Sequence, residues 1–390
     1  MLEKEAMVQE RRQSVKQYNK NRVFRFIAAR KRVSKQEIAA ELGLSLPTTT
    51  QNLNALKEEG LITENGTFES QVGRKARAIS IVPGFRVAVG LDITPHHISL
   101  VLADLNGDII DHLRKGFTIS SDEASYLALR DDIETFIRKN RIRPEQILGM
   151  GISIPGIIAF DHKTIVEADT LPVPNHFCQI MQEFFSFPCR ILNDASCAGV
   201  AEFWRNDYEN QTIVYLLLSN TVGGAILING APYAGMTNRS GEFGHMTIVP
   251  GGRHCSCGKD GCAEAYCSAL VLSGHTDNNL ETFFRELDSG NREFEALVDR
   301  YLEDLAILIN NVNLSLDCPV VLGGYMGAYL KRYLGRIREL VRERCTFVTD
   351  GLYVQPCVET KTERQPFPIF HLGDLCVIAK FITAFHEFFG

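Results

Sequence analysis

The sequence predicts an α/β protein of two domains, a small N-terminal domain over residues 1–82 and a larger one over residues 83–390. Apolar residues recur at helical spacing in the first 60 residues, whereas short apolar runs alternate with helical patterns after Pro83-Gly84. The charge also changes sign. The first 80 residues hold 15 Lys and Arg against 9 Asp and Glu, and the other 310 hold 26 against 38. A basic module joined to an acidic body indicates two kinds of ligand.

The composition is that of a globular protein in a reducing compartment. Hydrophobic residues make up 45% and charged residues 23% of the 390 residues, which excludes a disordered or fibrous chain. No apolar run reaches the ~18 residues of a membrane span, and the polar start of the chain lacks the apolar segment of a secretion signal. Eleven cysteines, an odd number, fit reduced thiols and a metal site better than a disulfide framework. We therefore expect a cytoplasmic protein without membrane contact.

The N-terminal domain shows the pattern of three helices. Apolar residues at helical spacing from Val23 to Ile27 stop at a basic cluster, which ends the first helix. Ser34 with a glutamate three positions later forms a capping box that starts the second helix. Gly43 supplies the turn, and the third helix starts near Pro47, a residue suited to the first helical position. This arrangement predicts a helix-turn-helix.

The third helix and the hairpin after it carry the candidate DNA contacts. Leu53 and Leu56 face the core, which leaves short polar side chains to read base edges in a major groove. Alternating runs at 60–64 and 78–82 predict a wing whose basic end, residues 73–77, can contact phosphates or the minor groove. Helix-turn-helix patterns also occur in protein-interaction modules, which is the alternative reading. The polar face comprises Thr48, Thr49, Gln51, Asn52 and Asn54, and the predicted DNA-binding residues are the first four of these with Arg74 and Lys75 of the wing.

The C-terminal domain alternates strands and helices. Apolar runs at 86–93 and 97–105 are followed by an Asn-Gly pair, a strong hairpin signal, and by a third run. A helix is predicted around 126–139, and later apolar runs predict strands at ILGMGISIPG, CRILND, IVYLLL, GAILI and CPVVLGG. A strand that ends at Asp92, followed by hairpins and strand-to-glycine loops, is similar to the actin-like, hexokinase-like (ribonuclease H-like) ATPase fold. That fold has two lobes around a ligand cleft.

A Gly-rich loop at residues 245–262 contains a candidate metal site. Three cysteines and one histidine, with no open coordination position, form the donor set of a closed tetrahedral site, so the cofactor would be a structural Zn²⁺. His254, next to one of the cysteines, is a competing ligand and Cys267 a weaker one. The alternative interpretation is that the three cysteines lie close together and bind no metal. The predicted ligands are His245, Cys255, Cys257 and Cys262.

Six motifs, in order, carry a resemblance to a known family. They are YNKNRVFRFI, SKQEIAAELGLSLPTTTQNLNALKEEGLITE, GRKAR, NDASCAGVAE, GEFGH and CSCGKDGCAE. Together they resemble the ROK family (repressors, uncharacterised reading frames and sugar kinases), specifically its xylose-repressor-like and N-acetylglucosamine-repressor-like regulators, which have a winged helix-turn-helix in front. The resemblance spans nearly the whole chain, and GEFGH and the cysteine motif are the most specific parts. It implies the same four zinc ligands and sugar contacts at Asn193, Asp194, Glu242, His245 and Glu264.

The chemistry of these residues agrees with a sugar site. A hexose presents hydroxyl groups that both donate and accept, and carboxylates and amides bind such groups in pairs. His245 has two ring nitrogens, so it could bind zinc through one and a sugar hydroxyl through the other. In kinases of the family the residue at Asp194 would act as the general base that takes the proton of the attacking hydroxyl.

The phosphate-binding loops depart from the kinase pattern. Where family kinases read Asp-Ile-Gly-Gly-Thr, this chain reads Asp-Ile-Thr-Pro-His from Asp92, and proline has no amide to donate. The second loop, SNTVGGA from Ser219, keeps only part of its glycines. Gly323-Gly324 is retained, but the late Gly-Ala-Ala helix start is absent from HLGDLCVIAKF. Asp194 is therefore interpreted as a vestigial base, and ATP binding is not expected.

These observations predict a sugar-responsive transcriptional regulator, a repressor of carbohydrate-metabolism genes rather than an enzyme. Its partners would be a double-stranded DNA operator and a sugar or sugar-phosphate effector. Helix-turn-helix proteins usually read palindromes, so we expect a homodimer, or a dimer of dimers, held together by the C-terminal domain. One alternative is an active ATP-dependent ROK sugar kinase that retains a DNA-binding domain. The other is an adaptor that docks a transport protein without binding DNA.

Overall fold

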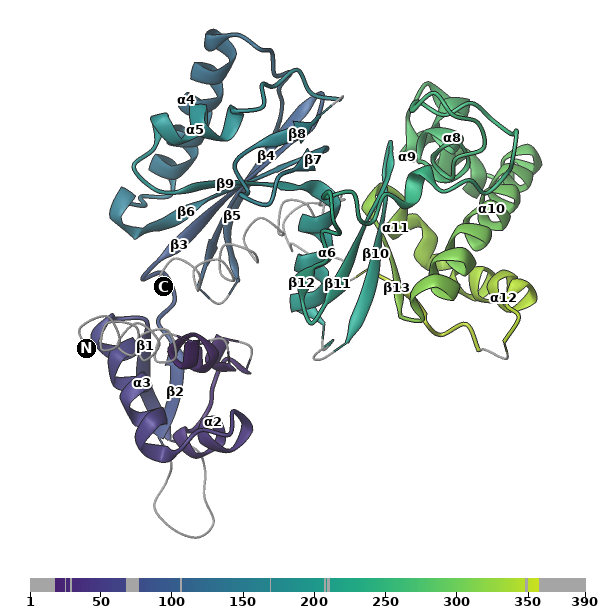
Figure 1. Ribbon diagram of the computed structural model, residues 1–390. Coiled ribbons are helices and arrows are strands. Elements are labelled where there is room, and N and C mark those ends of the chain that lie inside the picture. The colour runs from purple at the N-terminus through teal and green to yellow at the C-terminus, as the bar shows by residue number, and fades with distance from the viewer. Residues whose placement is uncertain are drawn as a thin grey trace, which may run out of the picture.

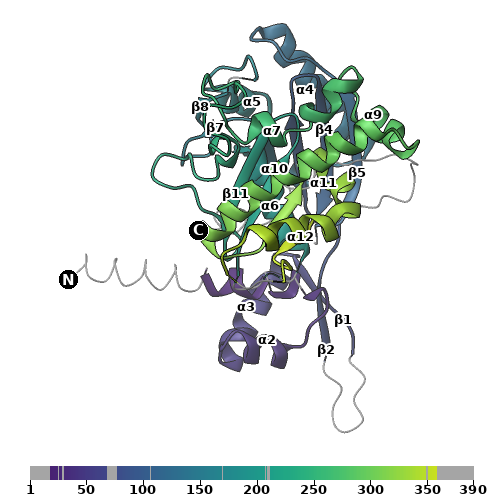
Figure 2. The same cartoon turned by 90° about the vertical axis from the view of Figure 1, so that its right-hand side faces the viewer.

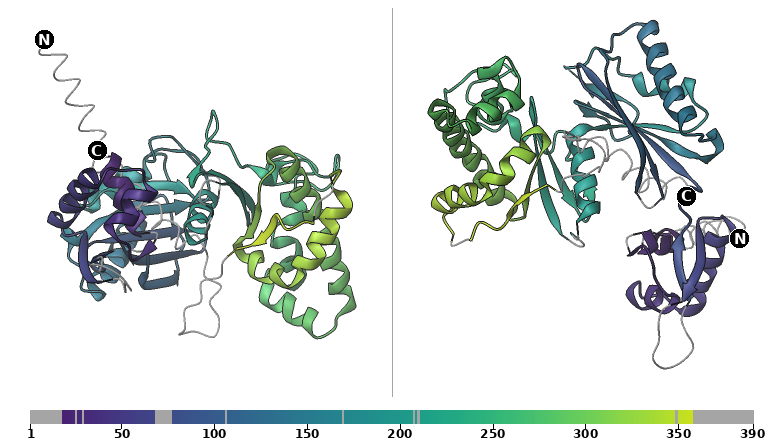
Figure 3. Two further views of the ribbon diagram at one scale, coloured as in Figure 1. Left: turned by 90° about the horizontal axis from the view of Figure 1, so that it is seen from below. Right: turned by 180° about the vertical axis from the view of Figure 1, so that it is seen from behind.

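The computed structural model describes residues 18–357 except 25, 29, 68–76, 106, 169, 207, 209–210 and 348–349. The described chain forms an N-terminal domain and two lobes (Figure 1). Each lobe is built on a five-stranded sheet. The N-terminal domain lies against the first lobe, and the second lobe stands beside the first (Figure 3). Among the described residues, no helix combines the length and the apolar character needed to cross a membrane.

The N-terminal domain has the predicted winged helix-turn-helix architecture. Residues 18–24 are helical, and Ser34 and Glu37 form the predicted capping box, in which each side chain accepts a hydrogen bond from the other's backbone amide, at 3.2 and 3.3 Å. Gly43 adopts the left-handed conformation that the turn needs, with φ +63°. The further elements are α2 (Lys35–Glu41), α3 (Leu46–Glu58) and the antiparallel pair β1 (Ile62–Thr67) and β2 (Arg77–Ile81).

Two of the predicted DNA-contacting residues are buried instead of exposed. Thr49 is 0% and Asn52 3% exposed, because positions 49, 52, 53 and 56 follow one face of α3, the face that packs on the domain core. Their polar atoms bond to the helix itself: Thr49 Oγ1 donates to Ser45 O at 3.0 Å, and Asn52 Nδ2 donates to Thr48 O at 2.9 Å. The expectation that both belong to the exposed face was therefore wrong.

The exposed face of α3 is narrower than predicted. Gln51 and Asn54 are exposed and Thr48 is half-buried. Arg74 and Lys75 of the wing lie outside the described residues, and Arg77, at the start of β2, is exposed and donates to Glu64 at 2.7 Å. A DNA contact from α3 would therefore come from the Thr48, Gln51 and Asn54 side.

The first lobe is a sheet with helices on one face. Its strand order is β5-β4-β3-β6-β9; β4 runs antiparallel to β3 and β5, and β6 is parallel to β3 and β9. Alternate residues of β3 join one buried cluster with α4 and α5. The elements are β3 (Val87–Ile93), β4 (His97–Asp104), β5 (Ile109–Gly116), α4 (Glu123–Lys139), β6 (Ile147–Ile154), the hairpin β7 (Ile157–Ile158) and β8 (Ile165–Glu167), α5 (Phe177–Phe184) and β9 (Cys189–Asn193).

The second lobe repeats the topology of the first. Its strand order, β12-β11-β10-β13-β14, again places the third, second, first, fourth and fifth strands side by side. On β10, Val214, Leu216 and Leu218 face the helices α9, α10 and α12, while the residues between them face α6; Figure 2 shows α10 and α12 along this lobe. The strands are β10 (Thr212–Leu218), β11 (Val222–Ile228), β12 (Ala231–Pro232), β13 (Val320–Gly323) and β14 (Val354–Pro356).

The helices of the second lobe complete the list. They are α6 (Asp194–Arg205), α7 (Glu264–Cys267), α8 (Leu270–Ser273), α9 (Leu280–Asp288), α10 (Arg292–Leu316), α11 (Gly324–Leu330) and α12 (Leu334–Arg344). The sequence predicted every one of the central strands, but not that the two sheets share one topology. The predicted two-lobed fold is confirmed.

The capping box at the start of α2 gives the first testable prediction. Replacing Ser34 by Ala removes the acceptor of the Glu37 amide, and loss of a helix cap costs about 1 kcal/mol. Amides of α2 should exchange their hydrogens about fivefold faster, measured by hydrogen exchange on the full chain. Replacing the exposed Glu58 by Ala is the control and should leave α2 unchanged. Equal exchange in α2 for all three proteins would contradict the prediction.

Candidate functional site

The chain passes from the first lobe to the second at Asn193 and Asp194. Asn193 is the last residue of β9, and α6, which packs on the second sheet, begins at the next residue. The Asn193 side chain caps α6, because its Oδ1 accepts from the amide of Ser196 at 2.8 Å. Its Nδ2 donates to the carbonyl oxygen of Gly156 in the first lobe at 3.1 Å. This residue thus ties both lobes to the start of one helix.

Two carboxylates meet at this junction. Asp194 accepts a hydrogen bond from the amide of Ala195 at 2.8 Å, and burial raises its pKa to about 7, with a further contribution from the negative charges of Asp92 and Glu242. Asp92, at the end of β3, is 5% exposed and accepts from the hydroxyl of Ser153 at 2.7 Å. Burial raises the pKa of Asp92 to about 6, although the hydrogen bond from Ser153 by itself lowers it. Asp92 is not among the sugar contacts that the resemblance implies.

Glu242 precedes a short helical turn in the second lobe, and His245 is the last residue of that turn. The turn, Phe243–His245, lies directly against the start of β11, and a Cβ at Gly244 would overlap the carbonyl oxygen of Val222. This close approach explains the glycine in the GEFGH motif. The Glu242 carboxylate lies 4.0 Å from Nε2 of His245. Burial raises the pKa of Glu242, and the charge of His245 partly offsets that shift.

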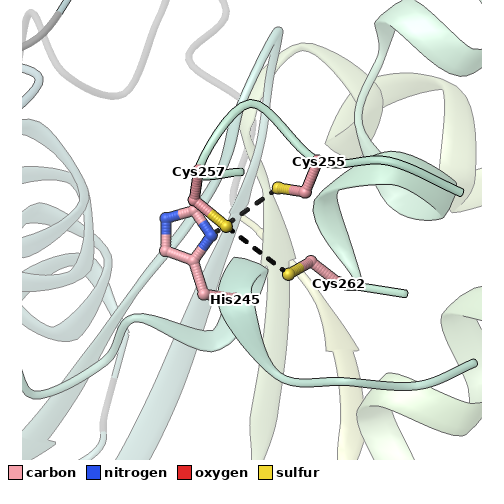
Figure 4. Close-up of side chains that lie close together, drawn as sticks. All are labelled: His245, Cys255, Cys257 and Cys262. Carbon is pink, nitrogen blue, oxygen red and sulfur yellow. Dashed lines mark hydrogen bonds between the residues drawn. The ribbon is translucent and has the colours of Figure 1, made fainter. Parts of the chain in front are cut away.

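The predicted metal ligands form one cluster (Figure 4). The ligand atoms of His245, Cys255, Cys257 and Cys262 all lie within 4.8 Å of one another. Cys257 Sγ is 3.7 Å from Cys262 Sγ, and Cys255 Sγ is 3.8 Å from Nδ1 of His245. Tetrahedral coordination with bonds of 2.3 Å places neighbouring sulfurs about 3.8 Å apart. The four side chains can therefore hold a metal ion, and their geometry fits a closed site.

The two nitrogens of His245 face different partners. Nδ1 faces the sulfur cluster, while Nε2 faces Glu242. The competing ligands of the sequence analysis lie outside the cluster: His254 bonds instead to Asp260 at 2.9 Å, and Cys267 is fully buried beside Tyr301, whose hydroxyl donates to the Cys267 carbonyl oxygen. His245 is thus the one residue that belongs to both predicted sets.

Glu264 connects the metal loop to the lobe. One of its carboxylate oxygens accepts from the hydroxyl of Ser256 at 2.7 Å, and the other from the amide of Val222 at 3.3 Å. Its charge also contributes to the raised pKa of Glu242. Glu264 therefore lies within electrostatic range of Glu242, and Glu242 within that of Asp194. The predicted sugar residues come together around one region.

A contact between the lobes lies beside this region. Arg239, just before Glu242, donates to the carboxylate of Glu167 on β8 at 3.3 Å. Both side chains are about half exposed, so the pair contributes little stability. No local sequence pattern predicts this pair, since the two residues lie 72 positions apart.

Comparison with known proteins identifies the family. The "ROK family" profile matches residues 88–365, and "Winged helix-turn-helix DNA-binding" matches residues 18–63. The protein belongs to the ROK family. It is 26% identical over 353 residues to the xylose repressor of Caldicellulosiruptor bescii, covering 85% of this chain and 88% of that one.

Both sugar kinases and transcriptional regulators are among the similar proteins. The chain is 29% identical over 205 residues to N-acetylmannosamine kinase of Vibrio cholerae, covering 50% of this chain and 70% of the kinase. Among solved structures, a ROK family transcriptional regulator, homologue of the E. coli MLC protein, superposes with a TM-score of 0.75 at 18% identity over 96% of this chain and 97% of that one. That likeness confirms the fold.

The loops that bind phosphate in ROK kinases are occupied by internal hydrogen bonds here. After β3, the Thr94 amide donates to His97 O at 2.9 Å, and Pro95 has no amide. At the start of α11, the amide of Gly324 donates to the Tyr215 hydroxyl at 3.3 Å, and that of Tyr325 donates to Ser219 Oγ at 3.4 Å. The amides of Thr94, Gly324 and Tyr325 are therefore already bonded within the chain. The HLGDLCVIAKF segment lies outside the described residues.

The raised pKa of Asp194 generates a prediction about stability and pH. Its folded pKa of about 7 lies well above the ordinary pKa of an aspartate, so the folded state holds the proton more tightly than the unfolded state and its stability falls as pH rises towards 7. Asp194→Asn removes this penalty. Without sugar, the variant should gain stability relative to the unmodified protein between pH 6 and pH 8, measured by urea unfolding.

Asp161→Asn is the matched control, with the opposite sign. Burial alone would raise the pKa of Asp161, but hydrogen bonds from Thr164 and Lys163 together lower it. Ionised Asp161 therefore stabilises the fold above pH 4, and its replacement should cost stability at both pH values. A gain for Asp194→Asn that is equal at pH 6 and pH 8 would contradict the assignment.

Proposed function

We propose that the protein is a sugar-responsive DNA-binding regulator, a repressor of carbohydrate-metabolism genes. One observation carries the proposal: a winged helix-turn-helix stands in front of a ROK domain. The proposed sugar contacts gather in one region of that domain, and amides at Thr94 and Gly324 are bonded within the chain, which supports the proposal. The xylose repressor relative supports this reading. The domain boundary lies at residues 82 and 83.

The proposed DNA contacts come from α3 and the wing. Gln51 and Asn54, with Thr48, present amides and a hydroxyl of the kind that reads base edges. Arg74 and Lys75 would add contacts to phosphates or to the minor groove. Thr49 and Asn52 support α3 from within, because they are buried. The operator is double-stranded DNA, read by a homodimer or a dimer of dimers.

The proposed sensor is the site around Asp194. Asn193, Asp194, Glu242, His245 and Glu264 would bind the hydroxyls of a sugar or sugar phosphate, and closure of the lobes would favour one arrangement of the dimer. A sugar shifts DNA affinity only through its different affinity for the two arrangements. A structural Zn²⁺ held by His245 and three cysteines would fix both the His245 ring and, through Ser256, the Glu264 carboxylate.

A sugar kinase that retains its DNA-binding domain is the second candidate. It is favoured by the kinase relative and by Asp194, whose pKa of about 7 suits a general base. Against it stand the Thr94-Pro95 turn and the paired amides of α11. We therefore assign Asp194 to sugar binding and no catalytic role, in a cytoplasmic protein.

The metal proposal predicts one zinc per chain. Cys257 is exposed, so Cys257→Ser should disturb packing little while removing a ligand. Zinc content should fall from about one to near zero, measured by metal analysis of protein purified without chelator, and the sugar response should be lost. Cys345→Ser, at a half-buried free cysteine outside the cluster, is the control and should keep its zinc. Absence of stoichiometric zinc in the unmodified protein would sink the proposal.

The α3 face predicts which residues read DNA. Binding sites would first be selected from a random duplex library. Gln51→Ala or Asn54→Ala should then reduce the preference for the selected site over a scrambled one by about 1–3 kcal/mol per base contact, measured by fluorescence anisotropy. Thr49→Ala should instead lower domain stability and leave the preference unchanged. If Thr49→Ala alone relaxed the preference, the assignment of the exposed face would be wrong.

The sensor proposal predicts a ligand effect without turnover. A sugar from a panel of hexoses, xylose, amino sugars and their phosphates should change operator affinity about 5- to 150-fold in a mobility-shift assay. Asp194→Asn should weaken this effect, because a charged acceptor is removed. No panel member should be phosphorylated with ATP. Turnover above about 1 per second, within the usual kinase range, would favour the kinase candidate.

A further inference from the structure

The N-terminal domain is joined to the first lobe by one buried leucine. Leu105, in the turn between β4 and β5, is 1% exposed and belongs to the same buried cluster as Val23, Phe24 and Ile79 of the N-terminal domain. Leu148, at the start of β6, packs against this cluster and is only partly buried. The core of the N-terminal domain is thus completed by a side chain from another domain.

The turn that carries Leu105 is held in shape by its own hydrogen bonds. Asp104, 7% exposed, accepts from the amide of Asp108 through Oδ1 at 3.0 Å, and its carbonyl accepts from the amide of Gly107 at 3.0 Å. The Asp104 amide donates to the Asp108 carbonyl at 3.1 Å. These bonds fix the direction of Leu105, so a movement of the sheet also moves its side chain.

Several further contacts between the described parts of the two domains lie at the surface. Lys31 lies 3.7 Å from Asp108, but both side chains are more than 60% exposed, so this pair adds little. In the linker, the Phe85 ring covers Gly60, and Arg86 donates to the carbonyl of Glu145 at 2.6 Å. Two open grooves of about 390 and 450 Å³ flank Val82 and Pro83. Leu105 is therefore closely packed, whereas the contacts around it are exposed and leave open grooves.

β4, the strand that precedes Leu105, begins near the proposed sugar site. β4 pairs along its whole length with β3, so that Asp104 lies opposite Val87 at one end and Ser99 opposite Asp92 at the other. Burial is the main cause of the raised pKa of Asp194, and the negative charge of Asp92 adds to it. Strands of seven and eight residues span roughly 25 Å. A continuous, hydrogen-bonded sheet thus connects the two regions.

We propose that Leu105 is the positioning residue that makes the winged helix-turn-helix and the first lobe move as one body, so that sugar-driven motion of the lobes reaches the DNA. This rests on the proposed function. Leu105 touches neither sugar nor DNA. It acts through the orientation of the N-terminal domain, and the second lobe is the part that moves relative to this body.

The test compares full-length variants. Leu105→Ser removes the apolar contact, Leu105→Ala does so more mildly, and Leu105→Met preserves it. Ile110→Ser, at a 45% exposed apolar residue of the neighbouring strand β5, is the matched control. Four readouts are needed: sugar affinity by calorimetry, operator affinity without sugar, the fold change in operator affinity caused by sugar, and the radius of gyration from small-angle X-ray scattering.

Leu105→Ser and Leu105→Ala should keep sugar affinity within about twofold, which shows that the lobes are folded, and should still bind DNA. Their radius of gyration should increase because the N-terminal domain is released, and the sugar-induced change in operator affinity should fall from the typical 5- to 150-fold to below about twofold. Leu105→Met and Ile110→Ser should behave like the unmodified protein.

The proposal is overturned if Leu105→Ala keeps the scattering profile of the unmodified protein or keeps its full sugar effect. If Leu105→Ser loses zinc or sugar binding, it is misfolded, and the milder Leu105→Ala variant is used to test the proposal. If the unmodified protein shows no sugar effect on DNA at all, the proposed function fails, and the scattering comparison by itself still decides whether Leu105 holds the two domains together.

Discussion

The structure depends on one constraint, the absence of any loop between β9 and α6. Because Asn193 ends a strand of one lobe and Asp194 begins a helix of the other, the side chains at this step face both lobes at once. Asn193 uses its amide oxygen to cap α6 and its amide nitrogen to bind the Gly156 carbonyl. A buried carboxylate at the next position is costly when ionised. A sugar hydroxyl that donates a hydrogen bond to this carboxylate could offset that cost. The junction is therefore suited to bind a sugar.

The candidate metal cluster would hold two of the proposed sugar contacts, His245 and Glu264, in place on an irregular stretch of chain. The loop from residue 245 to 262 contains few regular elements, and short loops with many glycines lose much conformational entropy on ordering. Four ligands to one ion would restrict it strongly. His245 belongs both to the cluster and to the face near Glu242, and Ser256 holds the Glu264 carboxylate. The proposed metal and sugar sites therefore share His245 and are joined through Ser256.

The same fold can serve a kinase or a sensor because phosphate binding needs free backbone amides, whereas sugar binding needs side chains. Here the Thr94 amide and the first amides of α11 already have partners within the chain. Closing those loops leaves Asp194, Glu242 and His245 in place. In the proposed regulator these amides would not help to position ATP, whereas a difference in sugar affinity between two arrangements of the lobes would be enough to act on DNA.

The sequence by itself determined the features that depend on neighbours along the chain. The Ser34 capping box, the left-handed Gly43, the central strands of both sheets and the candidate metal cluster within residues 245–262 all follow from local spacing and chemistry. Only the tertiary structure decided which residues are covered by distant segments. It buried Thr49 and Asn52, set Asp92 beside Asp194, and placed Leu105 in the core of another domain. Burial depends on which surfaces meet after the chain has folded, and a single sequence does not record those meetings in its local pattern.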